Sequence, residues 1–351
     1  MKKKRITWVD ITKGFLMILV VIGHYPGELD FPLAKYIYWF HMPAFFILSG
    51  LFFKPILDKK DIKPTIYKRF MQLIVPYLFF LSSITLVRYG MEIFSGNLDV
   101  EWYLNDLWTL AIGGRFIREA YGVFWFVTTL FFTYLLFMWL TTHFNRMKQF
   151  MILGLFYITA HFESILAMKV IGGKPSEAAQ SIPMIWNIDV ALMAIVYFAI
   201  GYYFKDLWMD VSKRWMSTAV FLSATAVLLD NFNIIDYRLS MKFLRYDHFI
   251  LDLVIPLSFT IALVGCFQLL AARLSLNWLQ KIEHHSLSIM YLHIFADIIL
   301  NDYFTYGLIG YTTIGIFIPI IVSILIKKLL PNGKTLLGGF SIKKEKTPIS
   351  T

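Results

Sequence analysis

The chain has 351 residues, of which 58% are hydrophobic and only 16% are charged, and its mean hydropathy is +0.63. A soluble domain carries about 25% charged residues, so this composition excludes an ordinary water-soluble globule and favours an integral membrane protein. In a soluble protein the net charge of +10 would suggest nucleic-acid binding, but here the basic residues cluster between apolar runs. We therefore interpret them as a membrane-orientation signal and expect a lipid bilayer, with no nucleic acid, as the partner.

Apolar segments recur along the whole chain, and each is close to the roughly 20 residues that a membrane helix needs. We expect an all-α protein of about ten transmembrane helices, with one transmembrane domain over residues 1–330 and a polar cytoplasmic tail over residues 331–351. The mixed stretch 99–119 predicts a partly helical outer loop. The predicted spans are 6–26, 36–54, 70–91, 122–143, 149–170, 182–204, 216–235, 250–272, 286–304 and 308–330.

The basic residues set the predicted orientation, because cytoplasmic loops of membrane proteins are enriched in lysine and arginine. With the N-terminus in the cytoplasm, 23 of the 33 lysines and arginines fall in inner segments and nine fall in outer ones. This bias predicts an even number of spans with both termini cytoplasmic. The sequence leaves the oligomeric state open.

The first span carries Asp10, Lys13 and His24, and ionisable groups inside a membrane usually face a bundle interior or a wet cavity. Lys13 and His24 are eleven residues apart, which is three helical turns plus about 20°, so both lie on one face, roughly 16 Å apart along the axis. That face offers a cation near the cytoplasm and a proton acceptor near the opposite surface. The alternative is that Lys13 snorkels at a helix end and His24 is an ordinary interfacial histidine.

The second and third spans add polar groups at both ends of the predicted bundle. The second span runs inward and brings His41 to about the depth of His24, so the two histidines form a candidate acid–base site. Alternatively, His41 only binds a backbone carbonyl exposed by Pro43. Arg69, next to Lys68 at the cytoplasmic border of the third span, is suited to bidentate phosphate binding, or is one more orienting charge.

Four carboxylates map to the outer halves of their predicted spans: Glu163, Asp189, Asp252 and Asp297. In the ninth span, His293, Asp297 and Asn301 are spaced i, i+4, i+8 and form one polar stripe. We infer a wet cavity that opens outward and is lined by acceptors suited to hydroxyl-rich ligands. The alternative is a structural polar seam between helices, in which Asp252 and His161 mark interfaces.

Several motifs are absent from the sequence, and their absence limits the function classes. There is no Gly-rich phosphate loop, no Cys/His metal spacing and no Gly-x-Ser-x-Gly elbow. Nucleotide hydrolysis, zinc chemistry and serine-hydrolase chemistry therefore have no support, and we expect no metal. The single cysteine, Cys266, excludes an internal disulfide.

Short motifs in chain order resemble the membrane-bound acyltransferase 3 family, in the variant of fucose 4-O-acetylase-like members. That family has a basic residue, ten intervening residues and then an essential histidine, and Lys13 and His24 match this pattern, with lysine where many members have arginine. Further segments similar to family motifs are Asp10–Gly14, Val21–His24, Phe40–Gly50, Arg69–Tyr77, Trp125–Phe126 with Leu130–Phe131, Pro183–Asp189 and Ser286–His293.

The resemblance implies a multi-pass enzyme of the bacterial cell membrane that takes acetyl-CoA or another acyl-CoA from the cytoplasm and acylates a hydroxyl of a cell-surface or exported carbohydrate, such as an exopolysaccharide. Lys13 and Arg69, with Lys68, would hold the donor phosphates. His24 would act as general base or carry the acyl group itself. The residues that would orient the acceptor or polarise His24 are His41, Asp189, Glu163 and His293.

Two other classes of protein would account for parts of the pattern. A polysaccharide or lipid-linked sugar transporter would use the same outward cavity, but the sequence shows no internal repeat of the kind common in transporters. A sensory or scaffolding membrane protein would leave the alignment of Lys13 with His24 unexplained.

Overall fold

The computed structural model describes residues 6–27, 33–246 and 248–340, and its regular structure there is helical. The β-type pairing within these ranges is one isolated antiparallel bridge between Ser240 and Arg245, so the predicted all-α class is confirmed. The α-helices are α1 Thr7–Gly23, α2 Leu33–Tyr38, α3 His41–Gly50, α4 Ile62–Phe94, α5 Val100–Ile112, α6 Trp125–His143, α7 Arg146–Ile165, α8 Pro175–Gln180, α9 Val190–Tyr203, α10 Lys205–Met209, α11 Lys213–Asn231, α12 Leu251–Ala271, α13 Asn277–His284, α14 Ser286–Leu300, α15 Leu308–Leu329 and α16 Gly333–Leu336.

Every predicted span falls on a helix, except that the second falls on the pair α2 and α3. In the described part of the chain, six helical segments are long and apolar enough to cross a membrane: Lys59–Phe94, Glu119–His143, Arg146–Ile171, Ile185–Tyr203, Leu251–Ala271 and Leu308–Leu329. These segments make the chain a multi-pass membrane protein. The count of ten spans stays a prediction, because α1 and α14 have only 17 and 15 residues. The cytoplasmic position of both termini also stays a prediction.

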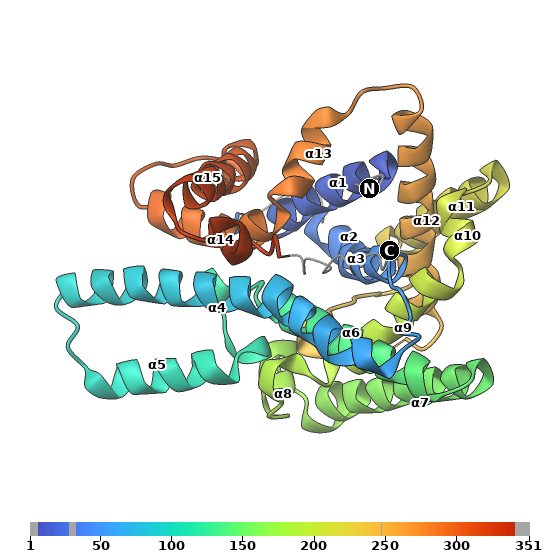
Figure 1. The fold of residues 1–351 in the computed structure, drawn as a ribbon, viewed down its shortest axis with the longest axis horizontal. Coiled ribbons are helices and arrows are strands. Elements are labelled where there is room, and N and C mark those ends of the chain that lie inside the picture. Colours follow the sequence, from blue (N-terminus) through green and yellow to red (C-terminus); the bar gives the residue numbers. More distant parts are fainter. Residues whose placement is uncertain (1–5, 28–32, 247, 341–351) are drawn as a thin grey trace, which may run out of the picture.

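Helix α1 packs against α2, α3, α12, α13, α14 and α15, and Figure 1 shows it in the upper group of helices, above α4 to α8. Its apolar side chains, such as Val9, Leu16 and Val21, are almost fully buried. A helix surrounded by other helices can present polar groups only to internal spaces. This position therefore determines what Lys13 and His24 can face.

A break between α2 and α3 divides the second predicted span at Trp39 and Phe40. Pro43 lies in the first turn of α3, where its missing N–H would have had no intrahelical partner. A continuous helix through this point would lose the bond from residue 43 to the carbonyl of Trp39. The sequence thus places a helix start at His41, in the interior of the bundle.

Helices α3 and α9 approach each other closely through two glycines. A Cβ atom added at Gly50 would lie 1.9 Å from the carbonyl oxygen of Phe198, and one at Gly201 would lie 1.9 Å from that of Ile47. Small residues permit such close backbone contact between membrane helices. This contact holds α3, and with it His41, against the body of the protein.

The first part of the predicted polar tail packs on α4. Gln72 donates a hydrogen bond to the carbonyl oxygen of Phe340 over 2.9 Å, and the Phe340 ring lies 5.6 Å from that of Tyr67. Helix α4 itself begins at Ile62, well before the predicted span 70–91, because the helix continues past its apolar stretch. The C-terminal segment therefore lies beside the end of α4 that carries Arg69.

Candidate active site

His24 directly follows α1, and its ring is tied to the helix. Nδ1 lies 2.7 Å from the carbonyl oxygen of Val20. A carbonyl can only accept, so Nδ1 carries the hydrogen and the neutral ring keeps its lone pair on Nε2. His24 lines a cavity of about 610 Å³. The imidazole is therefore held in the tautomer that a general base needs.

A row of rings extends from His24 to both sides. The His24 ring centroid is 5.2 Å from that of His293 and 6.0 Å from that of Tyr38, and the Tyr38 ring is 5.1 Å from that of His41. His41 and His293 also bond a carbonyl four residues earlier through Nδ1, at 2.8 and 2.9 Å. The buried Nε2 of His293 has no hydrogen-bond partner among the described residues. Three histidines from three helices thus share one tautomer and one location.

The cavity beside these rings has a volume of about 610 Å³, which is within the range of small-molecule sites. Its wall near His24 is apolar, and its rim is charged. The apolar wall includes Met17, Val20, Met42, Phe45, Val123, Trp125, Phe126, Met290 and Ile294, and the charged rim consists of Lys35, Arg118, Glu119, Arg238, Lys242 and Arg245. A ligand in this cavity would meet both these cations and the imidazoles of His24 and His41.

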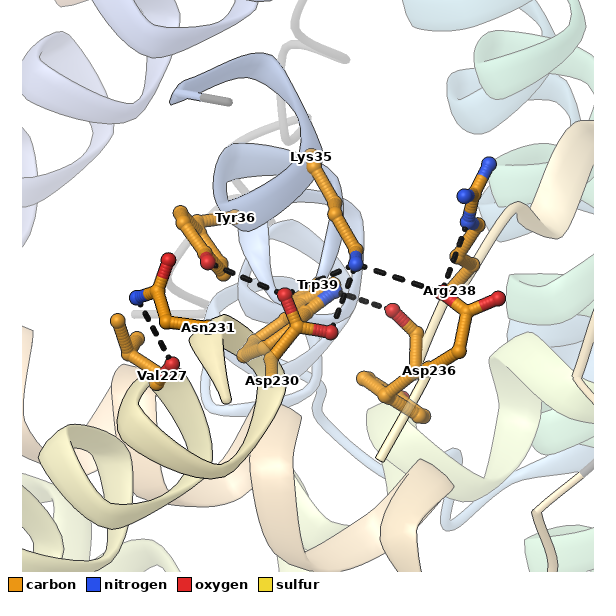
Figure 2. Close-up of polar contacts among 9 residues, drawn as sticks. Lys35, Tyr36, Trp39, Val227, Asp230, Asn231, Asp236 and Arg238 are labelled. Carbon is orange, nitrogen blue, oxygen red and sulfur yellow. Dashed lines mark hydrogen bonds and ion pairs between the residues drawn. The ribbon is translucent and has the colours of Figure 1, made fainter. Parts of the chain in front are cut away.

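Ion pairs fix one side of the rim (Figure 2). Lys35 on α2 reaches both Asp230, at the end of α11, and Asp236, at Nζ–oxygen distances of 2.7 and 3.4 Å. Asp236 also accepts a bond from Arg238 over 3.1 Å. Trp39 donates to the carbonyl oxygen of Tyr237 over 2.8 Å. The segment that continues to Arg245 is thereby anchored to α2 and to the α2–α3 break.

A second, smaller cavity of about 150 Å³ contains Lys13 and Arg69. The Lys13 ammonium lies 5.5 Å from the Phe52 ring centroid, and the Arg69 guanidinium lies 4.2 Å from that of Tyr134. Arg69 also donates to Gln72 over 3.2 Å. Aromatic walls hold both cationic heads at this space, where they can act on one anionic group.

The two cavities share the same helix faces. The lining of the small cavity includes Lys13 on α1, Ser49 on α3 and Leu130 on α6. The lining of the large cavity includes the residue four positions away on each of these helices: Met17, Phe45 and Phe126. Each pair is four residues, or about 6 Å, apart along its helix. The Phe45 and Phe126 rings, with centroids 5.7 Å apart, lie at the boundary. The cavities are therefore stacked one helical turn apart, with Lys13 on one side and His24 on the other.

Sequence comparison shows the family to which the chain belongs. Residues 6–328 match the profile of a family described as an acyltransferase domain, the acyltransferase 3 family. The chain belongs to this family. The earlier resemblance is thereby confirmed over nearly the whole chain.

Two relatives of this family member are nodulation proteins named NolL. The chain is 34% identical to NolL of Mesorhizobium japonicum over 148 residues, which is 40% of this chain and 36% of the relative. It is 32% identical to NolL of Sinorhizobium fredii over 137 residues, 36% of this chain and 34% of the relative. The matched part is thus about a third of the length of these curated relatives. No solved structure matches the chain.

The structure brings together most of the residues that the family motifs carry. His24, His41 and His293 form one cluster, and Lys13 and Arg69 share one cavity. The bond from His41 to the carbonyl of Ile37 is of the kind expected for a structural histidine, yet His41 also lines the large cavity. Lys68 lines neither cavity. The roles of these residues stay predictions.

Asp189 and Glu163 lie outside the lining of the large cavity. Asp189 forms a fully buried ion pair with Arg115, which also donates to Asn187 and to the carbonyl of Ala179. Glu163 on α7 is close enough to interact with both members of this pair. Within the described residues these two carboxylates do not line this cavity, and Asp189 is engaged by a cation 74 residues away in sequence, so their roles stay predictions.

The remaining predicted acidic groups are also engaged elsewhere. Asp252 accepts hydrogen bonds from the ring of His161 over 3.2 Å and from the backbone of His248 over 3.0 Å. Asp297 accepts one from Tyr306 over 2.8 Å, and Asn301 is exposed. These contacts join helices and loops. For Asp252 and His161 they are of the kind expected from a structural polar seam between helices.

Lys242 is a site residue that sequence reasoning missed. It is buried in the segment between α11 and α12, and its Nζ donates to the carbonyls of Ile117 and Gly122 over 2.8 and 2.9 Å. Burial, aided by repulsion from Arg118, lowers the pKa of Lys242 to about 7. A signal was present, because this lysine lies in a loop predicted to be outside, where lysine is disfavoured.

Proposed function

We propose that the protein is a membrane O-acyltransferase, and specifically an O-acetyltransferase of the bacterial cell membrane. Its donor is cytoplasmic acetyl-CoA or another acyl-CoA, and its acceptor is a hydroxyl of a cell-surface or exported carbohydrate. The observation that carries the proposal is the stacking of two cavities along α1. One contains Lys13 and Arg69, and the other contains the free Nε2 of His24.

The small cavity suits the phosphate end of the donor. Lys13 supplies a point charge and Arg69 a planar fork of donors, a combination that matches phosphate oxygens. The cavity is too small for a whole coenzyme, so the nucleotide end stays outside it. The thin pantetheine arm then crosses the Phe45–Phe126 boundary and carries the thioester to His24.

At the large cavity, His24 removes the proton from the acceptor hydroxyl while the hydroxyl oxygen attacks the thioester carbonyl carbon. A C–O bond forms, the C–S bond breaks, and the thiolate takes the proton from the imidazolium. The products are an ester and free coenzyme A. His41 and Tyr38 line the acceptor side and orient the hydroxyl, and the unpartnered Nε2 of His293 orients or polarises the His24 ring.

An acyl-histidine route uses the same nitrogen. In that route Nε2 attacks the thioester first, and the acceptor then takes the acyl group from the ring. Rapid quenching in neutral denaturant of protein mixed with radiolabelled acetyl-CoA, without acceptor, separates the two routes, because an acyl-imidazole is hydrolysed quickly in acid. Label on His24 supports the covalent route, and label that stays on the donor supports general-base catalysis.

The test of the proposed function uses the full chain in membrane vesicles with radiolabelled acetyl-CoA and surface glycans from cells that lack the gene. We expect label on glycan with the wild-type protein and a fall of about 10²–10⁴-fold for His24→Ala, the usual contribution of a general base. Normal transfer by the His24→Ala protein would overturn the proposal. Glycan movement across the vesicle membrane without any acyl transfer would instead support a transporter.

His143→Ala is the matched control for this experiment. His143 on α6 makes the same kind of bond to the carbonyl four residues earlier, Trp139, over 3.0 Å, but it is exposed and lines neither cavity. We expect its activity to equal that of the wild type. An equal loss in both variants would mean that the His24 effect comes from the helix end and not from the chemistry.

A further inference from the structure

The rim of the large cavity has an unusual charge. Its lining contains five cations, Lys35, Arg118, Arg238, Lys242 and Arg245, and one carboxylate, Glu119. All five cations belong to segments predicted to be outside the membrane, which hold nine of the 33 lysines and arginines. Outer segments tend to lack such residues. Their collection around one cavity is therefore a local feature that orientation does not explain.

Two of the five cations are neutralised by nearby carboxylates. Figure 2 shows Lys35 between Asp230 and Asp236, with Arg238 on the far side of Asp236. Asp230 is buried, with its side chain 4% exposed, whereas Asp236 is 63% exposed. These ion pairs hold α2, α11 and the segment after α11 together at the rim. They leave Arg118, Lys242 and Arg245 as the cations that could meet a ligand.

The other three cations form no ion pair within residues 6–27, 33–246 and 248–340. Lys242 uses two donors on carbonyl oxygens and has a third N–H. Arg118 donates to the amide oxygen of Gln180 over 2.8 Å, and Arg245 is partly buried beside them. Arg118 is exposed, whereas Lys242 is buried and Arg245 is partly buried, and removing a cation from water without a counter-charge is costly. An anionic group in the cavity would offset that cost.

We infer that this part of the rim is an anion subsite, and that the acceptor carries a phosphate or carboxylate group that Arg118, Lys242 and Arg245 hold while its hydroxyl reaches His24. The inference rests on the proposed function and specifies its acceptor class. The apolar part of the cavity lining fits the carbon face of a sugar. An anionic glycan would satisfy both ends of one cavity.

The phosphates of the donor are the competing occupant of this rim, and kinetics distinguish the two. If the rim holds the acceptor, changes at Arg245 raise the acceptor KM and leave the donor KM unchanged. If the rim holds acyl-CoA phosphates, the donor KM rises instead. A raised donor KM with an unchanged acceptor KM would overturn the inference.

The experiment separates surface glycans of the gene-deleted cells into neutral and anionic pools by anion exchange and offers each pool to wild-type vesicles with radiolabelled acetyl-CoA. We expect label in the anionic pool. Carbodiimide-mediated reduction removes carboxylates from a portion of this pool, and mild hydrofluoric acid removes phosphate from another. The treatment that abolishes labelling identifies the anion. Labelling of the neutral pool alone would overturn the inference while supporting the proposed function.

Arg245→Gln is the informative variant, because Arg245 lies in the segment between α11 and α12 and its guanidinium makes no hydrogen bond or ion pair within the described residues. Loss of a charge-assisted hydrogen bond raises the KM for the anionic pool by about tenfold. Arg118→Gln provides a second variant in case the first is poorly folded. Lys169→Ala, an exposed cation that lines neither cavity, is the control and keeps the wild-type KM. Unchanged KM values in both arginine variants would also overturn the inference.

Discussion

The two cavities of this protein share lining from α1, α3 and α6 but differ in size and in their charged residues. The small one, about 150 Å³, holds Lys13 and Arg69 against aromatic rings. The large one, about 610 Å³, is lined by five cations and one carboxylate as well as by the imidazoles of His24 and His41. We infer from this difference that the small cavity binds a single charged group, whereas the large cavity admits ligands of varied length.

The close contact between α3 and α9 holds a helix that lines both cavities, so its loss should disrupt both of them. Gly50→Ala places a methyl group against the carbonyl of Phe198, and we expect a destabilisation of about 1–3 kcal/mol and loss of activity with any acceptor. Thermal unfolding in detergent measures it. Gly154→Ala on α7, which has open space around it, is the control and should unfold at or above the wild-type temperature. Equal stability of the two variants would contradict the packing argument.

Changes in the small cavity should affect the donor alone. We expect Lys13→Met and Arg69→Met each to raise the KM for acetyl-CoA by about 10- to 100-fold, because each removes a charge-assisted bond to phosphate. The acceptor KM should stay constant. Initial rates at varied donor and acceptor concentrations give both values. Unchanged donor KM values in both variants would favour snorkelling and orientation roles for the two cations.

Changes beside His24 should affect turnover more than binding. His293→Phe keeps a ring next to His24 but removes Nε2, and we expect kcat to fall by about tenfold with both KM values near the wild type. His293→Gln, which retains hydrogen-bonding groups, should recover part of the rate. A fall in both variants together with loss of folded protein would indicate a packing role only.

The rim should make acceptor binding dependent on pH. Since the pKa of Lys242 is lowered to about 7, the protonated form that attracts an anion is lost as the pH rises from 6 to 8, and we expect the acceptor KM to increase by about fivefold. Arg118, Glu119, Arg245 and His24 also face this region. Lys242→Arg keeps those groups but stays charged, so its acceptor KM should be flat. A rise of equal size in both proteins would exclude Lys242 as its cause.

Part of this site could be predicted from sequence because it depends on local geometry. The spacing of Lys13 and His24 places them on one helix face. In the structure, Lys13 lines the small cavity and His24 lines the large one. The depth of His41 could be predicted for the same reason. Helix boundaries were less predictable. The apolar pattern predicts a span that begins at residue 70, whereas α4 begins at Ile62.

The rest of the site could not be predicted because it depends on contacts between distant segments. Asp189 looked available for a ligand, but its partner Arg115 comes from a loop that no spacing rule connects to it. Lys242 looked like an ordinary loop charge until folding buried it against the carbonyls of Ile117 and Gly122. Residue type and periodicity describe one helix at a time, whereas charge pairing belongs to the assembled bundle.

The contact of the C-terminal segment with α4 has a practical consequence for anyone handling this protein. Gln72 accepts a bond from Arg69 and donates one to Phe340, so the end of the chain and the guanidinium share one amide. A chain shortened before Phe340, or fused there to a bulky tag, would release that amide. Its kinetics would then imitate those of an Arg69 variant, and an affinity handle is better inserted at the exposed tip of the α4–α5 loop near Gly96.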